Sequence, residues 1–368
     1  MNTKRKNSNP KPFIKIANRK IGVEYPCFVV AEISANHHQN FAEAVRLIRV
    51  AAEVGADAVK LQTYTPDTIT LDSNKKWFRV SGKDNPKSWK NKTLYQLYQK
   101  AYTPWDWFPK LKKLAESLNL IFFSTPFDES AVDFLEKLSV PCYKVSSYDV
   151  VNIPLLAKIA KTKKPVIMSI GFATVDEIQL AIKTLKKHGT SQLALLHCVT
   201  AYSNQPNSSE MNLETIKDIQ QRFNTVAGFS DNNAGIEVPV QAAFAGASIV
   251  EKHFILKRSL GGPDASFSLE PEEFEVMVRR TRDAETVQGK VHYGSASSKE
   301  QYNKRYRPSI WVSRDVRKGE KFTKENIRCV RPGNGLPPKY YEKILGLRAK
   351  VAIKQATPMS WDVIEKQK

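Results

Sequence analysis

Short apolar runs, rich in β-branched and aromatic residues, alternate with segments of helical periodicity over most of the chain. Runs of this length and composition are typical of buried β-strands. The predicted strands are residues 27–33, 58–64, 121–127, 142–147, 165–170, 193–199, 226–230 and 248–254. Because helical segments lie between these runs, the pattern predicts consecutive βα units around a parallel sheet.

The helical segments carry their own start and stop signals. They cover residues 41–55, 107–119, 174–189 and 270–287. Gly55 and Gly189 are typical helix stops, and Thr174 with Glu177 forms a capping box. Eight strands joined by right-handed crossovers predict a TIM (β/α)8 barrel. An open doubly wound sheet is the alternative, but no G-x-G-x-x-G motif follows the first strand.

Each predicted strand becomes polar near its carboxyl end, where barrels carry their chemistry. The last one, SIVEKHF, places Glu251, Lys252 and His253 within an apolar run, although a buried charge is costly unless it is paired or bound. Polar residues at all eight ends favour a shared pocket over local pairing in loops. We therefore expect His253 to face into that pocket.

The residue types at these ends indicate the ligand. The candidates for a phosphate or carboxylate cradle are Lys60, Thr125, Lys144, Ser147, Ser169 and Ser230. Lysine supplies charge and the hydroxyls supply directed donors. Glu32, Asp149 and His253 could perform acid–base work or bind a divalent cation. His197 and Cys198 are neighbours on a strand and point to opposite faces, so they form no catalytic pair.

A different pattern begins after about residue 295, with short strands, tight turns and the segment RPGNGLPP. It indicates a small second domain. We divide the chain into a basic tail over residues 1–12, a barrel over 13–290, a linker over 291–305 and the small domain over 306–368.

Composition narrows the class of protein. The formal charge is +20, but the 57 Lys and Arg residues are spread along the chain without a zinc-finger, RNP or zipper pattern. We therefore expect small anionic substrates and no nucleic acid. Four scattered cysteines, no bilayer-length apolar run and no signal sequence lead us to expect a cytoplasmic protein that does not enter the membrane.

The chain resembles the sialic acid (nonulosonic acid) synthase family, and within it the pseudaminic acid synthase branch. The segments that carry the resemblance are AEISANHHQN (31–40), GADAVKLQTYTPDTIT (55–70), LYQLYQKAYTPWDW (94–107), FFSTPFDESAVDFL (122–135), YKVSSYDVVNIPLL (143–156), GIEVPVQAAFAGASIVEKHF (235–254), SLGGPDASFSLEPEEF (259–274) and RPGNGLPPKY (331–340). The resemblance implies a TIM barrel followed by an antifreeze-like (SAF) domain, in a domain-swapped homodimer whose SAF domains reach over the partner's barrel mouth.

The resemblance also implies a reaction, namely condensation of phosphoenolpyruvate with a 2,4-diacetamido-2,4,6-trideoxy hexose to give a nonulosonic acid and phosphate. The six cradle residues would hold phosphoenolpyruvate, and Glu32 and Gln62 would orient a metal-bound water. Asp264, Tyr202 and Arg307 would contact the amino sugar. His253 and Asn232 would bind the divalent metal, Mn²⁺ or Mg²⁺, with His253 and Asp149 counted among the catalytic groups.

Two positions depart from the family pattern. Asn232 stands where the family usually has a second imidazole ligand, and Asp149 stands where it has a glutamate. An amide oxygen binds transition metals more weakly than an imidazole does. Two alternatives therefore stay open: an N-acetylneuraminate or legionaminate synthase, and a degenerate barrel that binds sugar or phosphoenolpyruvate with little turnover.

Overall fold

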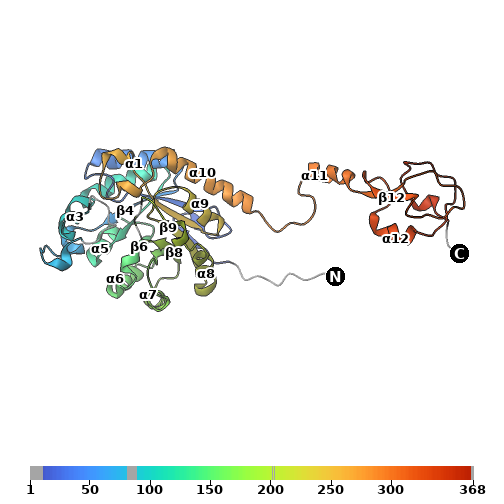
Figure 1. Ribbon diagram of the computed structural model, residues 1–368. Helices are drawn as coiled ribbons and strands as arrows, with labels where there is room; N and C mark the ends of the chain where they lie inside the picture. Colours follow the sequence, from blue (N-terminus) through green and yellow to red (C-terminus); the bar gives the residue numbers. More distant parts are fainter. Residues whose placement is uncertain (1–10, 81–88, 201, 203, 366–368) are drawn as a thin grey trace. The chain divides into compact units, whose positions relative to one another are not determined.

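The computed structural model describes residues 11–80, 89–200, 202 and 204–365. The chain forms two compact units, Met1–Gly289 and Lys290–Lys368 (Figure 1). Residues 1–10 of the predicted basic tail lie outside the described residues. No helix among the residues that the structure describes is long and apolar enough to cross a membrane.

The first unit is a closed barrel of parallel strands, with β10 pairing to both β9 and β3. The strands are β3 (Phe28–Glu32), β4 (Ala58–Thr63), β5 (Ile121–Pro126), β6 (Tyr143–Val145), β7 (Val166–Ser169), β8 (Leu193–Val199), β9 (Val226–Asp231) and β10 (Ile249–His253). The predicted TIM barrel is confirmed, with every predicted strand at its place in the sequence. The open-sheet alternative is wrong because the sheet closes.

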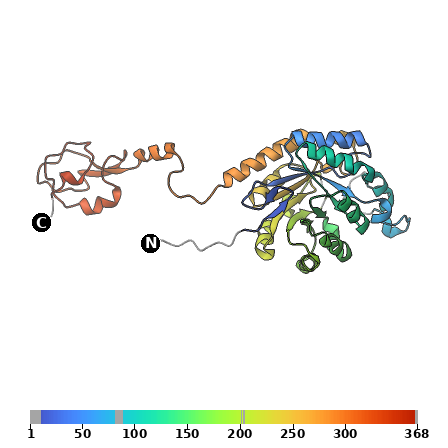
Figure 2. The same ribbon diagram turned by 180° about the vertical axis from the view of Figure 1, so that it is seen from behind.

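Helices surround this barrel (Figures 1 and 2). They are α1 (Phe41–Glu53), α4 (Phe108–Ser117), α5 (Glu129–Lys137), α6 (Ile153–Lys161), α7 (Val175–His188), α8 (Glu214–Phe223), α9 (Glu237–Phe244) and α10 (Pro271–Gln288). The capping box of Thr174 and Glu177 begins α7 as predicted. Gly189 ends the helix with φ of 121°, a conformation that side chains with a Cβ rarely adopt.

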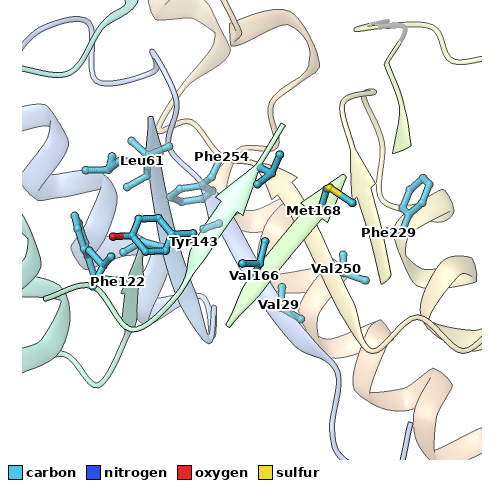
Figure 3. Packing of buried hydrophobic residues seen from close by; sticks show 14 of the residues in the cluster. Val29, Leu61, Phe122, Tyr143, Val166, Met168, Phe229, Val250 and Phe254 are labelled. Atoms are coloured by element: carbon cyan, nitrogen blue, oxygen red, sulfur yellow. The ribbon is translucent and has the colours of Figure 1, made fainter. Parts of the chain in front are cut away.

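Two apolar cores follow from the alternation of side chains along each strand. Val29, Leu61, Tyr143 and Val166 point outward and pack against the helices (Figure 3). Phe28, Ala58, Ile167, Val226 and Ile249 are among the residues that form the inner core. Polar residues replace these apolar side chains at the inward-facing positions nearest the carboxyl ends. The alternation thus builds a packed floor beneath a polar cavity.

A hairpin closes the opposite end of the barrel. It consists of β1 (Ile14–Ile16) and β2 (Arg19–Ile21), which pair antiparallel. Ile14, Ile16 and Ile21 are buried in the same inner core as the first residues of the barrel strands. The hairpin therefore seals the amino-terminal end of the barrel.

A long excursion between β4 and β5 was not predicted. It contains α2 (Pro66–Ile69), η1 (Lys76–Phe78), α3 (Leu94–Ala101) and η2 (Trp105–Trp107), and α2 packs against α3. Shorter 3-10 turns complete this unit: η3 (Ser147–Asp149), η4 (Ser208–Glu210), η5 (Arg258–Leu260) and η6 (Ala265–Phe267).

The second unit has a small core of its own, built from side chains such as Ile310, Phe322, Ile327 and Ile344. Its elements are α11 (Ser298–Asn303), η7 (Lys304–Tyr306), β11 (Ser309–Val312), β12 (Ile327–Val330), η8 (Pro338–Tyr340), α12 (Tyr341–Ile344) and η9 (Trp361–Val363). Strands β11 and β12 pair antiparallel. The segment predicted as a linker, 291–305, contains α11 and the start of η7.

Candidate active site

A cavity of about 440 Å³ opens at the carboxyl ends of the barrel strands. Such a volume lies within the usual range for small-molecule sites. The predicted site residues that line it are Glu32, Lys60, Gln62, Thr125, Lys144, Ser147, Ser169, Tyr202, Ser230, Asn232, His253 and Asp264. Strands and loops far apart in sequence thus bring most of the candidates together around one space.

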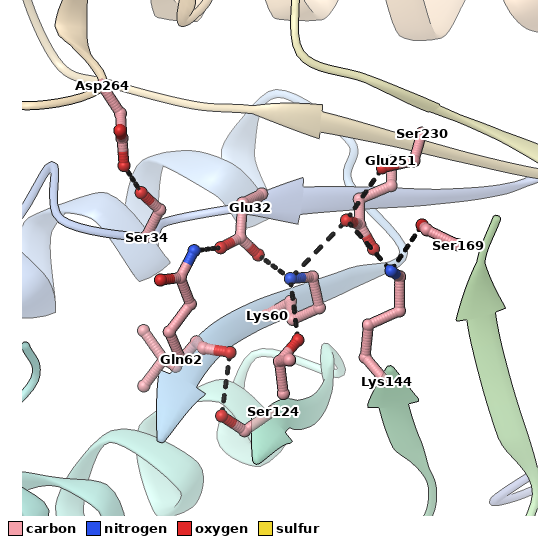
Figure 4. Close-up of polar contacts among 12 residues, drawn as sticks. Glu32, Ser34, Lys60, Gln62, Ser124, Lys144, Ser169, Ser230, Glu251 and Asp264 are labelled. Carbon is pink, nitrogen blue, oxygen red and sulfur yellow. Dashed lines mark hydrogen bonds and ion pairs between the residues drawn. The ribbon is translucent and has the colours of Figure 1, made fainter. Parts of the chain in front are cut away.

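Lys60 occupies the centre of a buried polar network (Figure 4). Its ammonium lies 2.5 Å from Glu32 Oε2 and donates to Thr125 Oγ1 at 3.2 Å. Gln62 Nε2 donates to Glu32 Oε1 at 2.9 Å. Burial lowers the pKa of Lys60, but the carboxylates of Glu251 and Glu32 outweigh this effect and raise it above its ordinary value. Lys60 is therefore a cation at neutral pH.

Lys144 supplies the second buried ammonium, on β6, which β5 separates from the strand of Lys60. Its Nζ donates to Ser169 Oγ at 2.6 Å and to the backbone oxygen of Val145 at 3.0 Å. Burial lowers its pKa, an effect that the carboxylate of Glu251 opposes. Ser147, on the loop that follows β6, accepts a hydrogen bond from Gly171 N at 3.1 Å. Lys144, Ser147 and Ser169 thus line the cavity together.

Glu251 connects the two lysines, a role that sequence reasoning did not assign to it. Its Oε1 lies 3.5 Å from Lys60 Nζ and 3.9 Å from Lys144 Nζ, and it accepts a hydrogen bond from Ser230 Oγ at 3.2 Å. Its position two residues before His253 could have indicated that it faces the same cavity, since alternate residues of a strand share a face. Two cations and two carboxylates thus balance one another inside the barrel.

Lys252, between Glu251 and His253, points away from the cavity. Lys252 is fully buried outside the barrel wall, where its ammonium lies 2.6 Å from Asp231 Oδ2 and donates to the backbone oxygen of Asn233. This ion pair anchors the turn that carries Asn232 into the cavity. The charged residues within the last strand are therefore explained by two networks, one on each side of the sheet.

His253 and Asn232 are the predicted metal ligands. Burial, then Lys60 and Lys252, lower the pKa of His253 well below its usual value, so the imidazole is neutral as a ligand must be. Its Nδ1 is buried without a hydrogen-bond partner. Asn232 Nδ2 donates to Cys198 Sγ at 3.3 Å. An imidazole nitrogen and an amide oxygen can each ligate a divalent cation, although among the described residues no group of three or more His, Cys, Asp or Glu side chains could hold one.

Asp264 lies on the β10–α10 loop and is half-buried. It accepts hydrogen bonds from Ser34 Oγ and from Ala35 N, the latter at 3.5 Å. Burial raises its pKa to about 7, with Glu32 acting in the same direction. Its carboxyl can therefore change protonation state near neutral pH.

The remaining predicted residues are placed differently. Tyr202 contacts the rings of Trp89 and Phe267 at 5.6 and 5.4 Å. The Asp149 carboxylate accepts from Ser146 Oγ at 2.5 Å, and Asp149 is not among the described residues that line the cavity. Arg307 is exposed and belongs to the second unit.

His197 and Cys198 take opposite faces, as expected from their adjacency. The His197 Nε2 atom lies 2.7 Å from the backbone oxygen of Met211, outside the barrel, whereas Cys198 lines the cavity. Burial raises the pKa of the Cys198 thiol to about 11, so the thiol stays protonated. His197 and Cys198 therefore form no nucleophilic pair.

One side of the cavity is apolar, which the sequence reasoning did not foresee. It comes from the excursion after β4 and consists of Tyr64, Ile69, Leu94, Leu97, Tyr98 and Ala101, which we term the apolar wall. The cavity thus has a charged part at the strand ends and an apolar part beside α3.

Comparison with known proteins agrees with this architecture. Residues 47–293 match the NeuB family and residues 307–365 match the SAF domain. A pseudaminic acid synthase from Helicobacter pylori is 39% identical over 93% of this chain and 98% of its own length. An N,N'-diacetyllegionaminic acid synthase from Legionella pneumophila is 36% identical over 95% of this chain and 99% of its length.

A solved structure extends the comparison to three dimensions. It is the N-acetylneuraminic acid synthetase from Leptospira borgpetersenii in complex with citrate, at 32% identity and a TM-score of 0.70. The match covers 80% of this chain and 96% of that one. The predicted resemblance is therefore confirmed, and the chain belongs to the NeuB family, with a SAF domain at its carboxyl end.

Proposed function

We propose that the chain condenses phosphoenolpyruvate with a 2,4-diacetamido-2,4,6-trideoxy hexose to form pseudaminic acid and phosphate. The observation that carries the proposal is the pair of buried ammonium groups of Lys60 and Lys144, placed with hydroxyls in one cavity. Phosphoenolpyruvate bears a phosphate and a carboxylate, and each needs a cation when it leaves water. The pseudaminic acid synthase from Helicobacter pylori supports the choice of product.

In the proposed reaction the methylene carbon of phosphoenolpyruvate attacks the aldehyde carbon of the open-chain sugar, and the aldehyde oxygen takes a proton. Water adds to the former enol carbon, and phosphate leaves with cleavage of its carbon–oxygen bond. One water is consumed for each phosphate released. The residues of the predicted cradle would hold phosphoenolpyruvate, namely Lys60, Thr125, Lys144, Ser147, Ser169 and Ser230.

Other cavity residues would act on the water and the sugar. The Glu32 carboxylate accepts from Gln62 and from Lys60, which fixes its orientation toward an incoming water. Asp264 would exchange a proton or hydrogen-bond with a sugar hydroxyl, and Tyr202 would contact the same substrate. The role proposed for Asp149 is indirect, because its carboxylate is bonded to Ser146 beside the phosphoenolpyruvate cradle.

We propose His253 and Asn232 as the groups that hold a divalent cation, Mn²⁺ or Mg²⁺. The support is the unpartnered Nδ1 of the neutral His253 imidazole and the presence of both side chains in the cavity. When bound, the cation supplies Lewis-acid polarisation of the aldehyde.

We also propose that the active form is a homodimer in which the second unit contributes Arg307 to the sugar site of the other copy. The support is the family membership and the exposure of Arg307 on the second unit. A guanidinium is suited to bind hydroxyl and carbonyl oxygens of a sugar.

The second candidate is a legionaminate or N-acetylneuraminate synthase, favoured by the Legionella pneumophila relative. The decisive experiment measures phosphate release from phosphoenolpyruvate with each of the three corresponding sugars, with Mn²⁺ or Mg²⁺ added. We expect the highest kcat/KM with the precursor of pseudaminic acid. A preference for another sugar would select the alternative, and phosphoenolpyruvate binding without phosphate release would indicate a degenerate barrel.

A further inference from the structure

The cavity divides into two regions of different polarity. The inward-facing ends of β3, β4, β6, β9 and β10 contribute charged and hydrogen-bonding groups. The apolar wall defined above comes instead from the excursion that follows β4. A ligand that fills both regions must be anionic or polar at one end and carry apolar groups at the other.

The residues of the apolar wall are buried or half-buried and line the cavity. Tyr64, Leu97 and Ala101 are only 2%, 7% and 9% exposed. Even so, within the described part of the chain, no residue of the wall belongs to the three apolar cores. Part of their apolar surface therefore faces the cavity, where it can contact a ligand.

The geometry of the wall is fixed by aromatic contacts. The ring of Tyr64 lies 5.5 Å from that of Tyr98 and 5.3 Å from that of Phe127, in edge-to-face arrangements. Trp89 also lines the cavity, with its Nε1 donating to the backbone oxygen of Pro263 at 2.9 Å. Because that indole N–H is already used, the Trp89 ring presents mainly apolar surface.

Hydrogen-bonding groups on the wall are few. Its members include two tyrosine hydroxyls, and Arg79 lies exposed at the cavity's edge with its Nε donating to the backbone oxygen of Asn74. A sugar carbon that carries a hydroxyl would lose hydrogen bonds to water when it packs against Ile69, Leu94 or Leu97. A methyl group would lose none and would gain from burial.

We infer that the apolar wall selects the sugar by its methyl groups, so that the site takes a hexose with a deoxygenated C6 and acylamino methyls in preference to one with a C6 hydroxymethyl group. This inference rests on the proposed function and deepens it, since it assigns the choice among related sugars to the excursion after β4. Discrimination of this kind in an apolar pocket amounts to about 10- to 200-fold.

The test uses reduced, open-chain alditols, which have no aldehyde and cannot react. One is the alditol of 2,4-diacetamido-2,4,6-trideoxy hexose, and the other is its 6-hydroxy counterpart. Calorimetric titration of the full chain with each gives a ratio of dissociation constants that is independent of turnover. We expect the deoxy alditol to bind at least about 10-fold more tightly.

Variants then assign the preference to the wall. Leu97→Asn and, separately, Ile69→Asn should reduce the ratio toward one, while Leu97→Met should preserve it because the surface stays apolar. Leu71→Asn is the matched control, since Leu71 lies in the same excursion but is 67% exposed and does not line the cavity. Phosphoenolpyruvate affinity and the melting temperature are measured for each variant, so that a loss of fold is recognised.

The two hypotheses can fail independently. Equal affinity of the native chain for both alditols, or an unchanged ratio in the folded Leu97→Asn and Ile69→Asn variants, would overturn the role of the wall. Absence of phosphate release with every sugar, combined with a retained alditol preference, would overturn the proposed reaction and leave the selectivity of the wall intact.

Discussion

Individual charged residues in the barrel mouth are held by one another, and this determines how the site responds to change. Lys60 contacts two carboxylates and Lys144 contacts one carboxylate and Ser169. Replacement of either lysine therefore removes an ammonium group that could bind an anion. It also leaves the negative charge of Glu251 with one positive neighbour fewer.

Lys144→Met should weaken phosphoenolpyruvate binding by at least about 30-fold, equivalent to about 2 kcal/mol, because a buried charge pair with the ligand is lost. Calorimetric titration measures the effect. Lys158→Met is the control, since Lys158 pairs with Asp133 on the outer helices and its loss should leave the affinity unchanged. Native affinity in the Lys144→Met protein would remove Lys144 from the proposed phosphoenolpyruvate site.

Asp264 makes a specific contribution to the pH dependence of stability. Its pKa is about 7 in the folded chain, against an ordinary value of 3.8, so the folded state binds more protons between these values. The free energy of unfolding therefore decreases as pH rises from about 4 through 7. Urea denaturation at pH 5 and pH 8 should show a smaller decrease for Asp264→Asn than for the native chain. Parallel changes in both proteins would contradict the raised pKa.

Asn232 sets the expected strength of metal binding. An imidazole in its place would add a stronger nitrogen ligand beside His253, so Asn232→His should bind Mn²⁺ at least about 10-fold more tightly. The readout is the dissociation constant from calorimetry, with His253→Gln as a control that should weaken binding in both backgrounds. Equal affinity of the native and Asn232→His proteins would mean that residue 232 does not contact the metal.

Secondary-structure elements place these residues through the alternation of strand side chains, and this is why much of the site could be predicted from sequence. His253 and Lys60 occupy inward positions that the apolar runs on either side identify. Glu251 was recognised at a strand end but received no role, because pairing across three strands is not visible in a single run. The apolar wall was missed because apolar residues of a helix, such as Leu97 and Tyr98 of α3, give the same sequence pattern whether they face a core or a cavity.

Close packing between elements also limits substitution in the barrel floor. A methyl group on Gly228 in β9 would lie 2.5 Å from Leu196 Cδ2 and 2.6 Å from the backbone oxygen of Ile249. Overpacking of this kind typically costs about 1–3 kcal/mol. Gly228→Ala should therefore lower the urea midpoint of unfolding. A midpoint equal to that of the native chain would show that β8 and β10 move apart at no cost.

At the scale of the whole molecule, the sequence predicted two folding units but could not relate them in space. The change of pattern near residue 295 lies close to the observed division between Gly289 and Lys290. Each unit has its own apolar core, so the pattern of apolar residues within each segment of the sequence reveals that unit. How two copies of the chain would associate depends on the fit between their surfaces. Surface fit leaves no periodic pattern of apolar residues in the sequence, so it could not be predicted.

The proposed contribution of Arg307 is tested in the intact chain. Arg307→Ala should reduce kcat/KM for the sugar by at least about 10-fold while phosphoenolpyruvate affinity is retained, because only the sugar contact is lost. Arg305→Ala is the neighbouring control, since the Arg305 guanidinium lies over the rings of Tyr302 and Tyr306. Native kcat/KM in Arg307→Ala, or a monomer by sedimentation with full activity, would contradict the dimer proposal.

The hairpin of β1 and β2 has a consequence for the order of catalytic events. Its isoleucines fill the amino-terminal end of the barrel, so a ligand of the cavity must enter and leave through the opening at the carboxyl end. Lys144 and Ser169 belong to the barrel interior, whereas the apolar wall is built by an excursion outside it. In the proposed reaction, phosphoenolpyruvate would therefore bind before the sugar, and phosphate would leave last. Steady-state kinetics should consequently follow an ordered sequential scheme, with inorganic phosphate as a competitive product inhibitor against phosphoenolpyruvate.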